Sequence, residues 1–495
     1  MKKFKIYYTS DTHGYLLPMD YATNTPKHAG LLSCGFDYDK DGNTLVIDGG
    51  DTIQGSPFTL FSHKLKMPVH PVATALNGAG YDFVTLGNHD FNYGEAHLSE
   101  YLNALDAQCL CANVSGDLPI LPYAIKTLEN GLRIGIVGIV TDWVNIWEKP
   151  EHIKNLTITD PFEAAKNALA DLNGTDMNIC LYHGGFECDV VTGEKLTEST
   201  ENIAYKIASD LDFDLMLTGH QHMPVEGAMI NGTYVVQPQD KAVHYLQIEG
   251  TVTDEGVTFT SQFKEPTGKF DSKQAKDIAA IESQVQKWLD APVGFLDQPL
   301  TPDDKVSMAL NGTPLADFFN QVQLEATGAD ISVTSLGNEV KGFQKEVTVR
   351  DVVSTYIYPN TIVVLSITGK QLKAVLERAA SYLEPGPKVS KAFLQPKIEH
   401  YNYDYFAGVT YTNTLSNPVG ERVSNILVNG KEIHDSDTFT ICMNNYRATG
   451  AGGYDSYKDC PVVKEYQTEM SELIIEFLSR HKHVSVTRFP APKYV

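Results

Sequence analysis

The sequence lacks the long apolar segments of membrane and exported proteins. Its 495 residues contain no run of 18 apolar residues, so no membrane-spanning helix is predicted and no membrane partner is expected. Only residues 1–4 precede the first predicted strand, too few for the apolar stretch of a signal peptide. We therefore expect a cytoplasmic protein, or an extracellular one if an export signal has been removed.

Basic residues are also scarce. The chain has 39 Lys and Arg against 62 Asp and Glu, which gives a formal net charge of −23. Such an acidic chain is poorly suited to grip a nucleic-acid polymer, because the phosphates of the polymer require a basic surface. A small phosphate ester can still bind where metal ions supply local positive charge. The composition therefore favours a small-molecule partner.

Paired cysteine motifs are missing as well. The seven cysteines include no Cys-x-x-Cys pair, which argues against a zinc ribbon and against a thioredoxin-type redox motif. Cys109 and Cys111 are two positions apart and would share one face of a strand. We expect buried thiols in a reducing compartment.

The chain does contain enough apolar residues to form sizeable cores. Hydrophobic residues make up 42% of the sequence and charged residues 20%, proportions typical of soluble globular proteins. A length of 495 residues is too great for one hydrophobic core, so we predict two domains.

Five predicted strands in the first half of the chain end in residues of metal-ligand type. The apolar runs at 5–9, 44–48, 83–86, 178–182 and 215–218 predict these strands. A single histidine directly after a strand is more often structural than a metal ligand. Because residues of ligand type follow all five strands, we favour one metal site to which all five strand ends contribute. The carboxyl ends of strands in an open α/β sheet meet at one edge. The candidate ligands are Asp11, His13, Asp51, Asn88, His183, His220 and His222.

Seven candidate ligands are too many for one ion. A single divalent ion takes about four to six ligands in most protein sites. The set suits two divalent ions that share a bridging carboxylate, as in enzymes that transfer or hydrolyse phosphoryl groups.

Helical patterns lie between and after these strands. We predict helices at 161–172, where Asp160 would be the N-cap, at 201–211, 314–326 and 369–382, and a long helix at 271–289 with a capping box from Asp271 to Gln274. Hairpins are predicted at 252–263 and around Asn429-Gly430. The run at 132–140 predicts another buried strand, without ligand types at its end. Alternation of strand and helix indicates an α/β layered domain.

The order Asp-x-His, Gly-Asp, Gly-Asn-His, His and Gly-His-x-His resembles the calcineurin-like dinuclear metallophosphoesterases, and in particular the bacterial 5′-nucleotidase family. This resemblance implies a four-layer αββα metallophosphoesterase domain at 1–268, a linking helix at 269–292 and an α+β nucleotide-binding domain at 293–495. It also implies two divalent ions of Mn, Zn, Fe or Co. Asp11, His13 and His222 would hold one ion, and the other would be held by Asn88, His183 and His220.

In the same family, Asp51 would bridge the two ions. His89 would lie beside the substrate phosphate and donate a proton to the leaving oxygen, after in-line attack by a hydroxide that bridges the ions. Asp90 is the carboxylate nearest to His89 in the motif.

Two stretches of the second half are unusual. Residues 401–406 are rich in aromatic side chains and residues 444–454 are rich in glycine. The alternatives are an ordinary strand and a flexible loop. The resemblance instead implies a nucleotide pocket in which Tyr403, or its neighbour Tyr401, and Tyr454 stack on the base. The implied substrate-binding residues are Tyr401, Tyr403, Tyr446, Arg447, Gly450, Gly452, Gly453 and Tyr454.

Two departures from the family pattern indicate a branch. Asn92 stands where 5′-nucleotidases usually have an acidic residue, and the stretch at 334–342 lacks their usual arginine. In both features the chain resembles the 2′,3′-cyclic-nucleotide 2′-phosphodiesterases with 3′-nucleotidase activity. This resemblance implies that His89 and Asn92 are catalytic residues. The alternatives are a 5′-nucleotidase or UDP-sugar hydrolase, and a catalytically silent nucleotide-binding protein.

Overall fold

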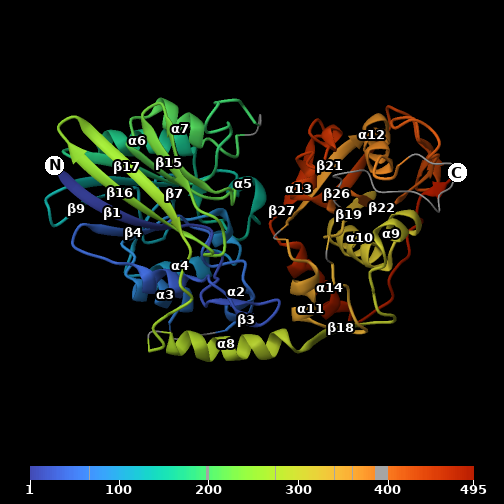
Figure 1. Cartoon of the computed structure of the whole chain (residues 1–495), viewed down its shortest axis with the longest axis horizontal. Coiled ribbons are helices and arrows are strands. Elements are labelled where there is room, and N and C mark those ends of the chain that lie inside the picture. Colours follow the sequence, from blue (N-terminus) through green and yellow to red (C-terminus); the bar gives the residue numbers. More distant parts are fainter. Residues whose placement is uncertain are drawn as a thin grey trace. The chain divides into compact units, whose positions relative to one another are not determined.

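The computed structural model describes residues 1–65, 67, 69–196, 200–273, 275–338, 340–358, 360–384 and 400–495. The chain divides into two compact units, residues 1–287 and 288–495. Figure 1 shows each unit as sheets covered by helices.

The N-terminal unit has two sheets packed face to face, with helices over their outer faces (Figure 1). The larger sheet has the strand order β17 (Gly256–Lys264), β16 (Tyr245–Thr253), β1 (Lys2–Thr9), β4 (Thr44–Asp48), β5 (Phe83–Val84), β6 (Gln108–Leu110) and β8 (Ile120–Leu121). The other has the order β14 (Val225–Ile230), β15 (Thr233–Gln237), β13 (Leu215–Thr218), β12 (Met177–His183), β10 (Arg133–Val140) and β9 (Tyr123–Thr127).

The helices of this unit are α1 (Leu31–Asp37), α2 (Pro57–Ser62), α3 (Pro71–Ala79), α4 (Glu95–Ala104), α5 (Val144–Trp147), α6 (Pro161–Asp171), α7 (Ala204–Asp210) and α8 (Lys276–Leu289). A 3-10 turn, η1, spans Asn88–Phe91. The short strands form two separate pairs, β2 (Met19–Asp20) with β3 (Thr25–Pro26) and β7 (Val114–Ser115) with β11 (Thr157–Ile158).

Strand β10 shows how the layers form. Ile134 and Ile136 pack into the core between the two sheets, whereas Val137 and Ile139 face the core under α6 and α7. Both faces of β10 are therefore buried, which is why the strand is apolar without interruption. The αββα architecture follows from such two-faced strands.

Most predicted elements of this unit are confirmed. Helix α6 begins at Pro161, and the Asp160 carboxylate accepts a hydrogen bond from the Glu163 N–H as its N-cap. Strands β4 and β13 have the predicted bounds, and β16 and β17 form the predicted hairpin.

Two helices begin later than predicted. Helix α7 begins at Ala204 because Glu201 and Asn202 bond elsewhere, to His220 and to the Gly185 N–H. Helix α8 begins at Lys276 after a turn in which the Asp271 carbonyl accepts from the Ala275 N–H. Gln274, the partner in the expected capping box, lies outside the described residues.

The C-terminal unit has a central sheet of order β22 (Asp404–Ala407), β19 (Ile331–Ser335), β26 (Thr438–Asn444), β21 (Ile362–Thr368) and β27 (Val462–Tyr466). Two further sheets have the orders β25 (Lys431–Glu432), β24 (Val423–Val428), β23 (Val409–Asn413), β29 (Lys493–Tyr494), and β20 (Glu346–Thr348), β18 (Pro292–Leu296), β28 (His483–Val484). Its helices are α9 (Lys305–Asn311), α10 (Pro314–Thr327), α11 (Val349–Thr355), α12 (Gly369–Ala380), α13 (Asn445–Ala448) and α14 (Met470–His481), with 3-10 turns η3 (His400–Asn402) and η4 (Asp455–Tyr457).

Local signals fix the ends of several of these elements. Thr313 caps α10 by accepting from the Leu315 N–H, and Gly328 ends it at a φ of 68°. Asn429 and Gly430 have φ values of 52° and 74°, as the predicted Asn-Gly hairpin requires.

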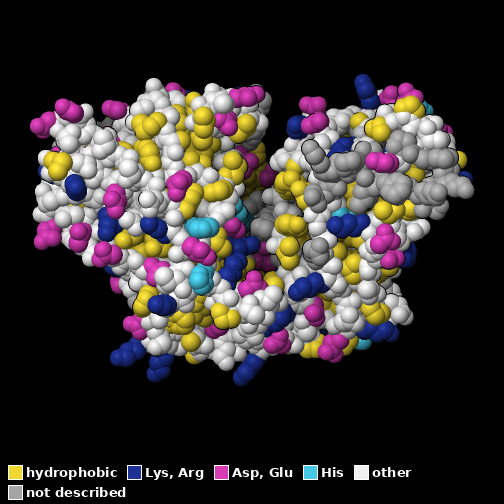
Figure 2. Space-filling model, viewed as in Figure 1, with side chains coloured by type: hydrophobic (Ala, Val, Ile, Leu, Met, Phe, Trp, Pro, Cys, Tyr) yellow, Lys and Arg dark blue, Asp and Glu magenta, His cyan; other side chains and the backbone are white. Residues whose placement is uncertain are grey.

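Charges of both signs lie on the surface. On the face shown in Figure 2, Lys and Arg side chains are interspersed with Asp and Glu. Of the helices that the structure describes, none combines the length and the hydrophobicity needed to cross a membrane.

The contact between the two sheets of the N-terminal unit generates a stability prediction. A Cβ atom on Gly138 of β10 would lie 1.9 Å from the Leu110 carbonyl oxygen of β6, a backbone atom that cannot rotate away. Gly138→Ala should therefore destabilise the unit by about 1–3 kcal/mol. The expected result is a thermal midpoint lower by roughly 2–4 °C per kcal/mol, measured by circular dichroism.

Gly135→Ala on the same strand is the matched control. The three atoms nearest to its Cβ would belong to the side chains of Asn178, Leu172 and Thr175, which can shift. A loss as large as that of Gly138→Ala would show that sheet spacing is not the constraint.

Candidate active site

All seven predicted ligand residues lie at the carboxyl ends of strands in the N-terminal unit. Strands β1, β4 and β5 are parallel neighbours in one sheet, and β12 and β13 are parallel neighbours in the other. The loops after these strands therefore open at adjacent sheet edges. Asp11 and His13 follow β1, Asp51 follows β4, Asn88 follows β5, His183 ends β12, and His220 and His222 follow β13.

Five of these residues have left-handed backbone conformations, which non-glycine residues rarely adopt. Their φ values lie between 48° and 74°. Each costs of order 1 kcal/mol or more and persists only where the surroundings enforce it. The residues are Asp11, His13, Asp51, His220 and His222.

The turns hold one another in place through backbone hydrogen bonds. The His13 N–H donates to the Asp51 carbonyl at 2.8 Å, and the Asp11 N–H donates to the Gly50 carbonyl at 2.9 Å. The Asp11 carboxylate in turn accepts from the His220 N–H at 3.0 Å. Side chains from both sheets are thus fixed to a common frame.

Asp11, His13 and His222 form one group of convergent ligand atoms. The Nε2 atoms of His13 and His222 are 3.1 Å apart, and the His222 Nε2 lies 3.4 Å from the Asp11 Oδ1. Two ligands bound at about 2.1 Å to one cation are separated by roughly this distance.

Asp51, His183 and His220 form a second group. The His183 Nε2 lies 3.1 Å from the Asp51 Oδ2. Both atoms are buried without a hydrogen bond in the part of the chain that the structure describes. Buried polar atoms left in this way are unusual and suit a bound cation.

The pKa values of the histidines in these groups also suit a site for bound cations. Burial lowers the pKa of His13 to about 4, so its imidazole is neutral at pH 7. Burial alone would lower the pKa of His183, but the Asp51 and Asp11 carboxylates outweigh it and raise the pKa to about 10. In the absence of an ion, a proton therefore takes the place of positive charge, and a metal ion would displace it.

Outer partners orient the imidazoles. The His13 Nδ1 lies 2.9 Å from the Gln54 carbonyl oxygen, and the His183 Nδ1 lies 2.6 Å from that of Gly49. The Glu201 carboxylate lies 2.8 Å from the His220 Nε2, which leaves Nδ1 of His220 for an ion. Glu201 was not predicted, because no motif connects it to a histidine 19 positions later.

Asn88 and His89 lie on η1, next to Asp51. The His89 N–H donates to the Asp51 Oδ1 at 2.7 Å, and the ring of His89 is 5.4 Å from that of His13. Gly87 is required before this turn, since a Cβ there would lie 2.1 Å from the Asp51 Oδ1.

Asp90 has a structural task rather than a contact with the His89 ring. Its buried carboxylate accepts from the backbone N–H groups of Gly87, Asp51, Thr52 and Ile53 at 2.8–3.0 Å. Burial raises the pKa of Asp90 to about 6 despite these donors. The carboxylate thereby holds the Asp51 turn against η1.

The side chain beside the His89 ring is that of Asn92. The His89 Nδ1 lies 2.8 Å from the Asn92 Oδ1. The ring is therefore oriented by the amide that distinguishes this sequence from the usual acidic pattern.

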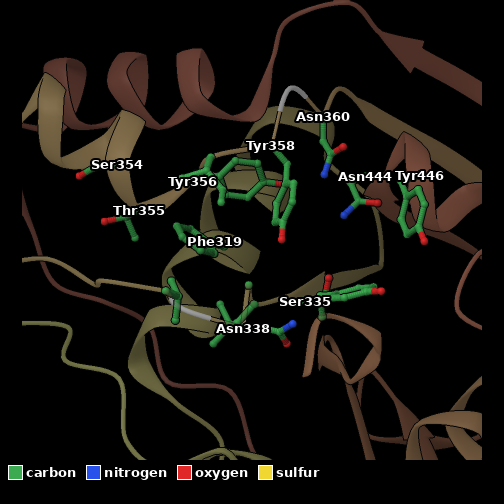
Figure 3. Close-up of a pocket in the computed structure, with 15 residues that line it drawn as sticks. Phe319, Ser335, Asn338, Ser354, Thr355, Tyr356, Tyr358, Asn360, Asn444 and Tyr446 are labelled. Atoms are coloured by element: carbon green, nitrogen blue, oxygen red, sulfur yellow. The ribbon is translucent and has the colours of Figure 1, made fainter. Parts of the chain in front are cut away.

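In the C-terminal unit, two predicted substrate residues line a pocket of about 450 Å³. Tyr401 comes from η3 and Tyr446 from α13, and Tyr358 joins them. Figure 3 shows Asn444 between Tyr358 and Tyr446, with Asn360 beside them. The lining thus combines aromatic faces with amide groups.

The predicted stacking pair of Tyr403 and Tyr454 is wrong. Tyr403 is 2% exposed and Tyr454 is 1% exposed. The Tyr403 hydroxyl donates to the Ala309 carbonyl, and the Tyr454 hydroxyl donates to the Asn402 carbonyl. Both rings are packed into the interior of the unit and present no face to a ligand.

The glycine-rich loop is likewise built around internal contacts. Arg447 is buried and its Nε donates to the Asp404 carboxylate at 2.9 Å, so its guanidinium does not serve a ligand as predicted. Gly450, Gly452 and Gly453 have φ values of 82°, 76° and 83°, and the Gly452 carbonyl accepts from Arg378. These glycines shape the loop that carries Tyr446, instead of contacting the pocket.

Two protein-family models match the chain, one within each of its two units. The family model described as calcineurin-like phosphoesterase matches residues 4–224. The model described as 5′-nucleotidase, C-terminal domain matches residues 292–459.

Individual relatives cover most of the chain. A solved structure of a candidate 5′-nucleotidase from Staphylococcus aureus is 33% identical, with a TM-score of 0.74 over 100% of both chains. The 2′,3′-cyclic-nucleotide 2′-phosphodiesterase/3′-nucleotidase of Salmonella typhimurium is 27% identical over 92% of this chain and 82% of its own length. The trifunctional nucleotide phosphoesterase YfkN of Bacillus subtilis is 24% identical over 96% of this chain, which spans 38% of that protein. The chain belongs to the 5′-nucleotidase family of calcineurin-like metallophosphoesterases, hydrolases of nucleotide phosphoester bonds.

Proposed function

We propose that this protein is a 2′,3′-cyclic-nucleotide 2′-phosphodiesterase with 3′-nucleotidase activity. The observation that carries the proposal is the pair of convergent ligand groups, Asp11-His13-His222 and Asp51-His183-His220. The backbone N–H of His89 donates to the Asp51 carboxylate beside them. Asn88 would complete the second group as an amide ligand, and Asp51 would bridge. The branch within the family is supported by Asn92 and by the name of the Salmonella relative.

The bound ions and the side chains of the site would have different roles in the reaction. Two divalent ions, of Mn, Zn, Fe or Co, would supply positive charge for the phosphate oxygens and a hydroxide nucleophile at neutral pH. The leaving ribose oxygen needs a proton, and His89 would donate it, a role worth about 10²–10⁴ in rate. Asn92 holds the His89 ring for this transfer.

The C-terminal pocket would bind the base. Tyr401 and Tyr446 offer aromatic faces, and Tyr446 is 49% exposed, so a base can reach it. Stacking on such rings contributes about 1–3 kcal/mol per base and tolerates different bases. The N-terminal unit would thus recognise the phosphate and the C-terminal unit the base.

A phosphate-release panel tests the activity. With Mn²⁺ added, 2′,3′-cyclic AMP and 3′-AMP should be hydrolysed faster than 5′-AMP and UDP-glucose, and exhaustive chelation should abolish every activity. A preference for 5′-AMP or UDP-glucose would instead identify a 5′-nucleotidase or a UDP-sugar hydrolase. Binding without turnover would identify a silent nucleotide-binding protein.

The proton donor has its own test. His89→Asn should slow 3′-AMP hydrolysis by about 10²-fold or more, because ribose oxygen is a poor leaving group. p-Nitrophenyl phosphate scarcely needs the proton and should lose much less. Equal losses on both substrates, measured as kcat at saturating Mn²⁺, would assign His89 to phosphate binding or to ligand geometry instead.

The base pocket predicts a difference between substrates with and without a base. The double variant Tyr401→Ala/Tyr446→Ala should lower kcat/KM for nucleotides by about tenfold or more. Hydrolysis of a small alkyl phosphate should not change.

Tyr403→Phe is the matched control, since it removes only a hydroxyl that faces the Ala309 carbonyl. It should leave kcat/KM for every substrate unchanged. Parallel loss of the alkyl ester and the nucleotide in the double variant would place base recognition elsewhere.

A further inference from the structure

A carboxylate that no motif indicates lies behind the proposed proton donor. Glu148 follows α5 directly, and its side chain is 5% exposed. The preceding residue, Trp147, stacks on the ring of His220 at a centroid distance of 5.5 Å. This short segment therefore contacts residues on both sides of the site.

The two oxygens of Glu148 are occupied by specific donors. Its Oε2 accepts from the Asn92 Nδ2 at 2.7 Å. Its Oε1 accepts from the Lys149 N–H at 2.7 Å and lies 2.8 Å from the His152 Nδ1. These contacts fix the position of the carboxylate at the back of Asn92.

The contact with Glu148 determines which way the Asn92 amide faces. An asparagine side chain has a donor end and an acceptor end, whereas an ionised carboxylate only accepts. The reversed amide would direct its oxygen at the Glu148 carboxylate, where neither group can donate. Asn92 must therefore direct its Nδ2 to Glu148 and its Oδ1 to the His89 Nδ1.

This orientation selects one tautomer of His89. Because the Asn92 Oδ1 only accepts, the His89 Nδ1 has to carry a hydrogen. The Nε2 is then the ring nitrogen that exchanges a proton with substrate.

We propose that Glu148 is a positioning residue for leaving-group protonation, acting through the Asn92 amide on the tautomer and orientation of His89. The inference rests on the proposed function, since it assigns a further part of the same reaction.

The proposed step transfers one proton from His89 to the leaving group. The bond between phosphorus and the leaving ribose oxygen breaks as hydroxide forms the new phosphorus–oxygen bond. The electron pair stays on the ribose oxygen, which takes the Nε2 proton of the His89 imidazolium. His89 becomes neutral and keeps its Nδ1 hydrogen on Asn92, and water later returns the Nε2 proton.

Substitution of Glu148 should affect poor leaving groups selectively. Glu148→Leu removes the acceptor, so kcat on 3′-AMP should fall about tenfold, a part of the full effect of a general acid. The loss on p-nitrophenyl phosphate should stay below about twofold. Glu148→Gln keeps an acceptor oxygen and should recover most of the activity. Glu151→Gln, the same change at an exposed glutamate three positions later, is the control and should have no effect.

A double-mutant cycle tests whether Glu148 acts through Asn92. In the Asn92→Asp background the side chain accepts from His89 in either orientation, so no orienting contact is needed. Glu148→Gln should then raise activity on 3′-AMP, because it relieves repulsion between two carboxylates. Glu148→Leu, which removes the acceptor, should not lower activity in this background. If Glu148→Leu lowers activity by the same factor in both backgrounds, Glu148 does not act through Asn92.

The tautomer can be observed directly in zinc-loaded protein with ¹⁵N-labelled histidine. The His89 signals, assigned by their loss in His89→Asn, should show a protonated Nδ1 in the wild type and a mixture of tautomers in Glu148→Leu. An unchanged tautomer together with equal losses on both substrates would overturn the inference.

Failure of the inference is distinguishable from failure of the proposed function. A wild type that hydrolyses no nucleotide of the panel refutes the function. A wild type that hydrolyses 3′-AMP while Glu148→Leu keeps full kcat refutes only the role of Glu148.

Discussion

The placement of two buried carboxylates among imidazoles is the constraint on which the N-terminal unit depends. Burial would raise the pKa of Asp51, but His183 and His89 hold it well below its usual range. Burial would also raise the pKa of Asp11, yet His222 and His183 lower it to about 2. Charges this deeply buried are stable only when opposite charge is close. Strand ends from both sheets bring imidazoles to these carboxylates. A protonated imidazole supplies the positive charge when no ion is bound, and metal ions would supply it when they bind.

The same arrangement explains why strained backbone collects at one place. Five candidate ligands have left-handed φ values, and their turns are joined by hydrogen bonds such as the one from the His13 N–H to the Asp51 carbonyl. Isolated loops would relax out of these conformations. The face-to-face sheets, packed through residues such as Ile6 and Ile136, provide a rigid base that prevents this.

The sequence was sufficient for the strand ends, the ligand types and the layered fold, because these depend on local periodicity and short motifs. It was not sufficient for the pocket of the C-terminal unit that we propose to bind the base. Residues 400–402 form a 3-10 turn, so Tyr401 departs from strand alternation and lines the pocket, while Tyr403 packs inside. Glu148 and Asn92 are 56 positions apart, and only the tertiary fold brings them together.

Strand β10 has no ligand residue at its end, yet the segment that follows it contacts both halves of the site. The Thr141 hydroxyl donates to the carbonyl of Glu201, whose carboxylate contacts His220, and Trp147 stacks on that imidazole. Glu148, the next residue, contacts the amide that orients His89. His220 follows a strand of one sheet and His89 follows a strand of the other. A strand end without ligands therefore orients a candidate metal ligand and the candidate proton donor together, which keeps the geometry between them fixed.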